Sequence, residues 1–201
     1  MSDREMIFKA IRKALDPLPE RAPYPEWETG ITVARHARGA TETLDLFLER
    51  LVAVKGIALE GWEPLGSFLD KEDAWTGFVD GPLAGKAREA LPGRTLEEIF
   101  SREQIDTYAF AITRAKGAIA ETGTIILEDA DSPHRLSALA PWIHIAVIRR
   151  ETIIRTLAEA VETFGNDPSI IYATGPSKTA DVEGILIQGV HGPGIQACLI
   201  E

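Results

Sequence analysis

Apolar residues recur every three or four positions in several stretches of the chain, which is the spacing of one face of an α-helix. The helical ranges that this pattern predicts are 3–15, 41–55, 65–70, 83–91 and 151–164. Asp16-Pro17 ends the first of these helices, and Gly56 is placed to end the second. The long helix over 151–164 is followed by Gly165–Pro168, a run that is typical of a helix end.

Strand patterns lie between these helices, and from about Thr107 onward the pattern becomes strand-like. The predicted strands are 57–60, 119–120, 124–127, 143–148, 169–173, 185–187 and 196–200. The second and third of them flank a tight turn. Because strands alternate with helices, we expect an α/β protein whose sheet is covered on both faces. The run of strands near the C-terminus predicts that part of the sheet is antiparallel.

The first 40 residues differ in character from the rest. Four prolines between residues 16 and 30 predict an extended arm, because proline is excluded from helix interiors and inner strands. Tyr24 and Trp27 are placed to anchor this arm to its own domain or to a second subunit. We therefore expect a helix and Pro-rich arm over 1–40, a single α/β domain over 41–201, and a possible homo-oligomer.

Composition narrows the classes of partner. The chain has 21 basic and 31 acidic residues and a formal net charge of −10, which disfavours nucleic acid and anionic membrane surfaces. No apolar run approaches the ~18 residues of a membrane span, and the first residues lack the pattern of a secretory signal. We expect no membrane span and a cytoplasmic protein.

Cys198 is the only cysteine, which rules out an intramolecular disulfide, a Cys-ligated iron–sulfur cluster and a Cys-rich zinc site. His36 and His134 have no ligand-spaced partner, so no metal site is expected. His144 lies inside a strand pattern, where a hydrogen-bonded core histidine is the expected role.

The first segment that suggests chemistry is Glu121-Thr122-Gly123-Thr124, directly after a predicted strand. It offers a carboxylate, two hydroxyls and closely spaced backbone N–H groups, which suit anion binding and proton transfer. The alternative is a simple hairpin turn with Glu121 in solvent. Arg114, Lys116 and Arg135 flank this turn and either form a local basic pocket or are solvated.

The second segment is 174–184, again after a predicted strand. Ser177, Lys178 and Thr179 present three donors in a row, which suits a carboxylate or a phosphate. Asp181 and Glu183 follow at a spacing of two. The alternative is a loop in which Ser177 or Thr179 caps a helical turn. Open α/β sheets bind their ligands at the ends of strands, which is why both segments are candidates.

The third segment, 188–194, surrounds His191 with three glycines and a proline. A histidine held in such a frame can donate a proton or bind an anion. The alternative is a connection between two strands in which the histidine is merely exposed.

Taken together, Ala-Glu-Thr-Gly-Thr at 120–124, Gly-Pro-Ser-Lys-Thr-Ala-Asp-Val-Glu at 175–183 and Gly-Val-His-Gly-Pro at 189–193 resemble the lactate-utilisation (LUD) domain family. Pro141-Trp-Ile-His-Ile-Ala-Val also resembles that family. The resemblance covers roughly residues 40–201. Gly194 departs from it, since the family often has a bulky or charged residue there.

The resemblance implies a three-layer α/β/α sandwich with a mostly parallel sheet, similar to the ribose-5-phosphate isomerase and CoA-transferase-like fold. It also implies a role in oxidising L-lactate to pyruvate together with iron–sulfur-containing lactate utilisation proteins. The single cysteine fits a subunit that carries no cluster or other cofactor itself and leaves the iron–sulfur clusters to its partners.

The family motifs map onto the candidate residues of all three segments. The expected catalytic residues are Glu121, His191, Asp181 and Glu183. The expected ligand-binding residues are Thr122, Gly123, Thr124, Ser177, Lys178, Thr179, Gly189 and Gly192. Lys178 and the nearby hydroxyls are expected to hold a small carboxylate.

Three functions remain open at this point. The first is the cluster-free subunit of an iron–sulfur L-lactate oxidation system. The second is an independent enzyme of the CoA-transferase or sugar-phosphate isomerase type that uses Glu121 as nucleophile or base. The third is a non-catalytic assembly or regulatory subunit whose loops bind a partner.

Overall fold

The computed structural model describes residues 2–16, 37, 39, 41–128, 135–164, 169–180 and 184–201. The chain divides into two compact units, Met1–Ile31 and Thr32–Glu201, and each is described by itself. Within the described ranges, no helix is both long enough and apolar enough to cross a membrane.

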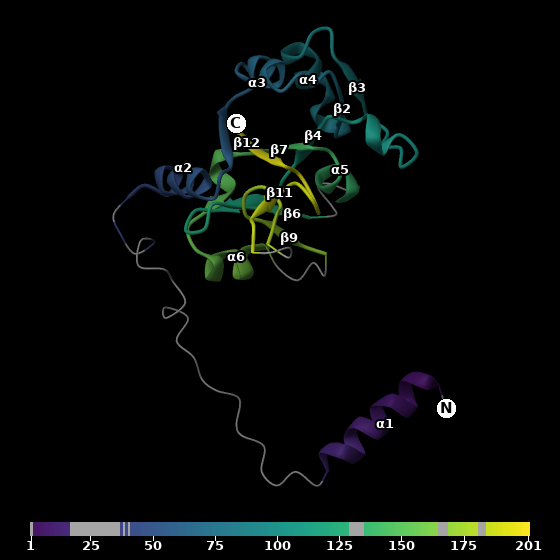
Figure 1. The fold of residues 1–201 in the computed structure, drawn as a ribbon. Coiled ribbons are helices and arrows are strands. Elements are labelled where there is room, and N and C mark those ends of the chain that lie inside the picture. Colours follow the sequence, from purple (N-terminus) through teal and green to yellow (C-terminus); the bar gives the residue numbers. More distant parts are fainter. Residues whose placement is uncertain are drawn as a thin grey trace. The chain divides into compact units, whose positions relative to one another are not determined.

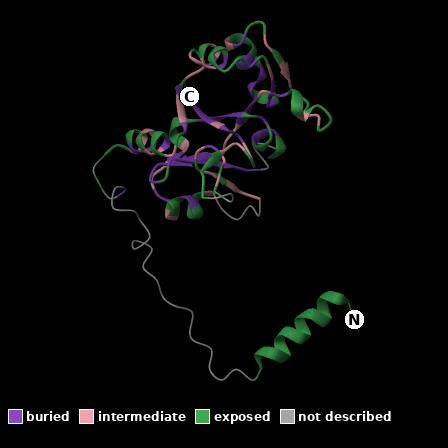
Figure 2. Cartoon of the chain, in the orientation of Figure 1, coloured by how far each residue is buried: buried purple, intermediate pink, exposed green. Residues whose placement is uncertain are grey.

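The described part of the first unit is helix α1, Asp3–Leu15, as the apolar spacing predicts. Its N-terminus forms a capping box: the Ser2 side chain accepts a hydrogen bond from the Glu5 N–H, and the Glu5 carboxylate accepts one from the Ser2 N–H. Every residue of α1 is exposed (Figure 2). The predicted Pro-rich arm lies outside the described residues, as do His36 and His134.

In the described part of the second unit, six strands form one all-parallel sheet in the order β1-β12-β7-β4-β2-β3 (Figure 1). Their bounds in this order are Ile57–Glu60, Ile195–Ile200, Ile143–Ile148, Phe110–Arg114, Thr76–Val79 and Thr95–Glu97. The C-terminal strand β12 is parallel to both of its neighbours, so the expected antiparallel pairing does not occur in this sheet. The parallel α/β sheet itself is confirmed.

Helices α3, Leu65–Lys71, and α4, Ala84–Ala90, cover one face of the parallel sheet. Residues that alternate along the strands, such as Ile145 and Leu199, form a buried apolar cluster with both helices. Helix α4 directly follows the short 3₁₀ helix Gly81–Leu83. Figure 1 shows α3 and α4 on the side of the sheet away from α6.

The opposite face packs against helix α2, Thr43–Ala53, helix α5, Arg135–Leu139, and a second sheet. Phe47 and Leu51 of α2 join Ile148 and Cys198 of the parallel sheet in one buried cluster. Four strands of the described chain form the second sheet, in the order β8-β5-β6-β9. Their bounds in this order are Ile153–Ile154, Gly117–Ile119, Thr124–Leu127 and Ile171–Ala173.

Helix α6, Leu157–Phe164, covers the outer face of this second sheet through Ala160 and Phe164. The β5–β6 pair is antiparallel and encloses the turn at 121–123, as the sequence predicts. The antiparallel pairing expected for the chain is therefore present, but in the second sheet. One side of the parallel sheet thus carries helices alone, and the other carries two helices, a mixed sheet and α6.

The remaining described elements are short. They are the 3₁₀ helices Ile105–Thr107 and Arg150–Thr152 and the strands β10, Lys178–Thr179, and β11, Ile187–Gln188. Strands β10 and β11 form an antiparallel hairpin that the apolar pattern predicts only in part. Strands β2 and β3 were not predicted, because each is very short and lies among glycines, prolines and charged residues.

The predicted helix over 151–164 is wrong in its first half, because the helix begins only at Leu157. Ile153–Ile154 pair with β5 instead, so their apolar side chains serve a strand. Thr156 then starts the helix: its hydroxyl accepts from the Glu159 N–H at 3.2 Å, and the Glu159 carboxylate accepts from the Thr156 N–H at 3.2 Å.

Arg155, directly before this cap, connects the helix to the start of the domain. Its guanidinium donates to the carbonyl oxygens of Ala37, Gly39 and Thr41 at 2.6–2.8 Å. Ala37 is buried in the same cluster as α2. Residues 37 and 39 thus pack with the larger unit.

A row of buried polar side chains crosses the centre of the parallel sheet. His144 on β7 contacts the Thr113 hydroxyl on β4 through Nε2 and the side-chain amide oxygen Oε1 of Gln196 on β12 through Nδ1, both at 2.9 Å. All three residues are almost fully buried. Burial lowers the pKa of His144 to about 4, since an imidazolium would lose its hydration there. The expected core histidine is confirmed.

This pKa predicts a dependence of stability on pH. Between pH 6.5 and 4 the unfolded chain protonates His144 while the folded chain does not, so the free energy of unfolding falls as the pH falls. The full effect, reached near pH 4, is about 3 kcal/mol. Urea unfolding at pH 7 and pH 4 should show that His144→Asn removes this part of the slope. His191→Ala, at an exposed histidine, is the control and should retain it.

Candidate functional site

Two of the three motif segments pack against the C-terminal end of helix α2. Gly123 has a φ of +65°, and a Cβ there would lie 2.5 Å from backbone atoms of Arg50 and Leu51. Gly175 has a φ of +70° and approaches the Val54 carbonyl oxygen so closely that a side chain would clash with it. Only glycine allows both the left-handed conformation and this close backbone approach.

A chain of threonine hydroxyls joins these two segments. The hydroxyls of Thr122 and Thr124 lie 2.6 Å apart, and those of Thr124 and Thr174 lie 2.7 Å apart. Residues 50 positions apart in the sequence are therefore hydrogen-bonded. Thr122 and Thr174 are exposed, so this row of hydroxyls reaches the surface.

Backbone hydrogen bonds add the third segment. The Ser177 N–H donates to the Pro193 carbonyl at 2.8 Å, and the Gly189 N–H donates to the Ser177 carbonyl at 3.0 Å. The indole ring of Trp142 lies where side chains at Gly189 and Gly194 would be. A bulky residue in place of Gly194 would displace this ring, which explains why glycine stands at the position that departs from the family pattern.

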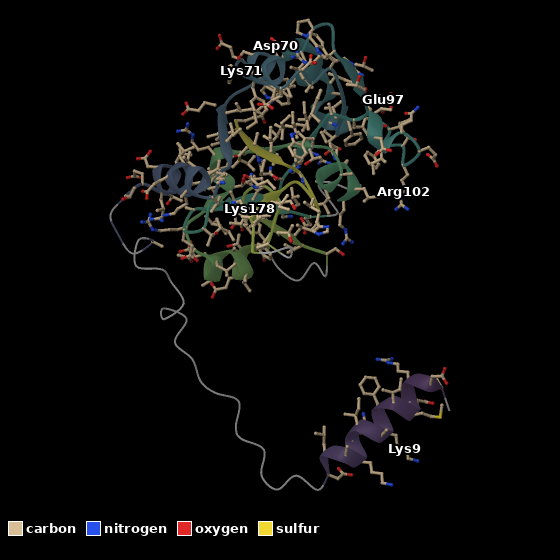
Figure 3. The ribbon with its side chains drawn as sticks, in the orientation of Figure 1. Lys9, Asp70, Lys71, Glu97, Arg102 and Lys178 are labelled. Carbon is tan, nitrogen blue, oxygen red and sulfur yellow. The ribbon has the colours of Figure 1, made fainter. Side chains whose placement is uncertain are left out.

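Two lysines connect the segments to α2. Lys178 Nζ donates to the Val54 carbonyl oxygen at 2.9 Å, and Lys55 Nζ donates to Gln188 Oε1 at 3.3 Å. Figure 3 shows Lys178 over the centre of the larger unit. We call residues 121–124, 174–179 and 187–194, with the α2 end 50–55, the motif surface.

The structure thus brings all eight of the expected ligand-binding residues together. Those on the motif surface are Thr122, Gly123, Thr124, Ser177, Lys178, Thr179, Gly189 and Gly192. His191 lies in the same loop and is exposed. Asp181 and Glu183 lie outside the described residues, so their expected roles stay predictions.

Glu121 occupies a different environment from the exposed hydroxyls. Its side chain is nearly buried, with 6% of the residue exposed, and Oε1 accepts a hydrogen bond from the Leu157 N–H at 2.7 Å. The carboxylate therefore satisfies a free N–H at the start of α6, where the helix dipole favours negative charge. The alternative that places Glu121 in solvent is excluded, and the hairpin turn itself is present.

The motif surface lies at the amino edge of the parallel sheet. The end of α2 leads into β1, Trp142 precedes β7, and Gly194 precedes β12. The first two segments do follow strands, but these strands are β5 and β9 of the mixed second sheet. The rule that places ligands at the carboxyl ends of parallel strands therefore does not apply to them.

Sequence reasoning assigned no role to two residues of this surface, Lys55 and Thr174, or to Trp142, which lies beside it. Lys55 contributes an ammonium group from a non-glycine position with a φ of +68°. Trp142 adds apolar area beside the motif surface and is half exposed. Thr174 completes the hydroxyl row. Lys55 and Trp142 become neighbours of the motifs only through the fold, whereas the signal for Thr174 is its place beside Gly175 in the second segment.

Metal binding has no support in the described part of the chain, where no group of three His, Cys, Asp or Glu residues could hold an ion. Cys198 is fully buried in β12, and burial raises the pKa of its thiol. A thiolate ligand or nucleophile is therefore disfavoured there. The residues present do not fit an iron–sulfur cluster within this chain.

The fold and site define a class of α/β protein in which a parallel sheet carries a glycine-rich polar surface at its amino edge. The sequence profile of the LUD domain matches residues 71–200. The chain belongs to the LUD domain family, as the three motifs predict.

Curated relatives carry the name lactate utilization protein C. That of Deinococcus radiodurans is 36% identical over 102 residues, which cover 48% of each chain. That of Anoxybacillus flavithermus is 31% identical over 132 residues, or 64% of this chain and 53% of the relative. That of Bacillus subtilis is 33% identical over 105 residues, or 48% and 42%. The chain spans about half the length of the curated relatives that it matches.

A solved structure supports the fold. The crystal structure of a DUF162 family protein from Deinococcus radiodurans superposes with a TM-score of 0.60 over 79% of this chain and 96% of that chain. The sequence identity is 23%, so the similarity concerns the fold alone.

The close approach at Gly123 predicts a specific cost for a side chain. Gly123→Ala should lower the free energy of unfolding by about 1–3 kcal/mol more than Gly61→Ala, since overpacking adds to the backbone strain. Gly61 is the matched control, because its φ is +70° and no atom lies within 4 Å of a Cβ there. Urea unfolding of both variants measures the difference. Equal losses would contradict the tight contact with α2.

The contact of Glu121 with α6 predicts a capping effect. Glu121→Ala should cost about 1–2 kcal/mol in unfolding free energy, and Glu121→Gln less, because glutamine keeps an acceptor oxygen. Thermal and urea unfolding measure both. Glu162→Ala, on the exposed face of the same helix, is the control and should stay near the wild-type value. An unfolding free energy of Glu121→Ala equal to that of the wild type would contradict the capping role.

Proposed function

We propose that this chain is the cluster-free subunit of a lactate utilisation system that oxidises L-lactate to pyruvate, and that its motif surface binds a small carboxylate. Membership of the LUD domain family and the name shared by the relatives support the metabolic role. The observation that carries the proposed site is the convergence of three motif segments on the end of α2, with Lys178 at their centre.

The chemistry of the motif surface suits a carboxylate ligand. Lys178 carries an ammonium group with three N–H donors, of which the bond to Val54 uses one. The row of threonine hydroxyls adds one O–H donor, because its two internal hydrogen bonds use two of its three hydroxyl hydrogens. The ammonium group of Lys55 adds further N–H donors. A charged donor surrounded by neutral donors binds a carboxylate with charge-assisted hydrogen bonds.

Oxidation of L-lactate releases two electrons and two protons for each pyruvate formed. Iron–sulfur clusters on the partner proteins would supply the electron acceptor, in keeping with the single buried cysteine of this chain. His191 is exposed in the third motif and is the proposed acceptor of one of these protons, because an imidazole nitrogen can accept a proton, and the other proton would go to water. Asp181 and Glu183, which lie outside the described residues, remain proposed catalytic residues.

The position of Glu121 favours the role of a subunit over that of an independent enzyme similar to CoA transferases or to ribose-5-phosphate isomerase. A nucleophile or base must reach substrate, whereas the Glu121 carboxylate is nearly buried and bonded to the start of α6. We therefore assign Glu121 a positioning role, in which it fixes the motif turn against α6. A purely assembling subunit stays the second candidate.

The proposed ligand site predicts the effect of one substitution. Lys178→Ala should weaken the binding of L-lactate or pyruvate by more than tenfold, about 1.5–3 kcal/mol, because it removes a charged hydrogen bond. Isothermal titration of the purified chain measures the affinity. Lys71→Ala, at an exposed lysine on α3, is the control and should bind like the wild type. Unchanged binding by Lys178→Ala would place the carboxylate elsewhere.

Activity of the assembled system separates this function from pure assembly. His191→Ala should abolish lactate oxidation while co-purification with the iron–sulfur partners persists. If both His191→Ala and Glu121→Gln keep the native fold and full activity in the assembled system, the result would support the purely assembling subunit. Turnover of an acyl-CoA or a sugar phosphate by the purified chain alone would support the independent enzyme.

A further inference from the structure

The motif surface lies at the amino edge of the parallel sheet, so the proposed carboxylate site uses no residue at the carboxyl edge. At this edge lies a crevice with a volume of about 400 Å³, between the ends of β4 and β7 and Glu201 after β12. Figure 1 marks the C-terminus at this edge. A volume of this size falls within the range of ligand pockets for small molecules.

The topology favours a ligand at this place. After β2, the chain adds β3 on one side and then returns to add β4 on the other, so the direction of strand addition reverses between β2 and β4. Open parallel sheets bind ligands outside the carboxyl ends of strands at such a switch point. Leu83, just after β2, and Arg114, at the end of β4, both line the crevice.

The wall of the crevice is cationic in a strongly acidic chain. Arg114, Lys116 and Arg149 line it, and Glu201 is the one acidic side chain among its described lining residues. Lys86, outside the lining, holds the Glu201 carboxylate at 2.6 Å and balances its charge. Arg149 Nε lies 3.5 Å from Glu151 Oε1, so each of the three cations has an acidic partner. The wall therefore offers charged N–H donors to an incoming anion, with their charges balanced by these acids.

Two nearly buried carboxylates hold two of these cations in position. Arg114 Nε donates to Asp80 Oδ2 at 2.7 Å, and Lys116 Nζ lies 2.6 Å from Glu128 Oε2. Neither acid lines the crevice. Arginine has five N–H donors and lysine three, so an ion pair on one side is compatible with an anion on the other. Such pairs hold the head groups in place before a ligand arrives.

Part of the lining of the crevice is apolar. Phe164 lines the crevice from the end of α6, and a Cβ on Gly117 would lie 2.7 Å from its Cζ atom. Leu83 and Val147 add apolar surface. The site thus combines an anion-binding side with an apolar side, as in pockets that bind the charged end and the organic body of one molecule.

We infer that this crevice binds the phosphate group of a small phosphorylated metabolite, at a second site separate from the carboxylate site of the motif surface. A phosphate carries up to two negative charges and several acceptor oxygens, which matches the two arginines and the lysine of the wall. A three-carbon monocarboxylate would contact few of these groups and fill little of the volume.

The test is isothermal titration of the full chain with inorganic pyrophosphate and inorganic phosphate at constant ionic strength. Saturable binding of at least one of them is expected. Arg149→Ala should weaken it at least tenfold, and this exposed arginine can be replaced without disturbing the core. Arg102→Ala, an exposed arginine that does not line the crevice, is the matched control (Figure 3).

The lysine needs a double variant, because its removal alone leaves the buried Glu128 carboxylate uncompensated. Lys116→Met with Glu128→Gln keeps this pair neutral and should also weaken binding at least tenfold. If the double variant does not fold, Arg149→Ala decides. Absence of saturable binding by the wild type, or wild-type affinity in Arg149→Ala, would overturn the inference.

Lys178→Ala separates this site from the motif surface. It should leave the pyrophosphate and phosphate affinities unchanged, and Arg149→Ala should leave the affinity for L-lactate unchanged. Loss of both affinities in Lys178→Ala would show that the anions share the motif surface, which contradicts a second site. Failure of lactate binding alone would remove the proposed carboxylate site and spare the crevice.

Discussion

The close packing of two glycine turns against the last turn of α2 is the constraint on which the motif surface depends. Gly123 and Gly175 both adopt left-handed conformations and both approach the backbone of α2 more closely than any side chain would allow. Because α2 leads directly into β1, this contact also fixes the mixed second sheet relative to the parallel sheet. The hydroxyl row from Thr122 to Thr174 and the bond from Lys178 to Val54 exist only in this arrangement. The conformational freedom of two glycines thereby positions the polar groups of three distant segments.

The two edges of the parallel sheet differ in chemistry. The amino edge carries the hydroxyls, lysines and glycine turns of the family motifs, and the carboxyl edge carries a cationic crevice with a partly apolar lining. Between them lies a core in which Thr113, His144 and Gln196 are hydrogen-bonded across three adjacent strands. A buried polar row whose members are all satisfied favours one register of these strands, since a slip would leave buried groups unpaired. The core thus fixes the relative positions of two surfaces that it does not itself form.

The fold was predictable where pattern and length were unambiguous. Strands β1 and β7 have the predicted bounds, because each is a short run of apolar residues between strong end signals. The prediction of a helix from Glu151 onward was wrong. Ile153 and Ile154 suit a strand as well as the apolar face of a helix, and in the structure they pair with β5. The motif residues were recognisable by type and spacing, but the buried position of Glu121 was not. The first half of the predicted helix 151–164 is instead strand β8 and a helix cap. Because α6 therefore begins at Leu157, the N–H of that residue can donate to the Glu121 carboxylate.

By itself the sequence determined the α/β class, the positions of most elements, the family and the polar motifs, because these depend on periodicity and on local residue types. Only the tertiary structure decided that all strands of the larger sheet are parallel, that the motif surface lies at its amino edge, and that Arg114, Lys116 and Arg149 surround a crevice at the other edge. These facts depend on which strands become neighbours, and strand order is set by packing between segments far apart in the chain. The local pattern contains no information on that choice, so the same residues could have been read as solvated until the fold placed them together.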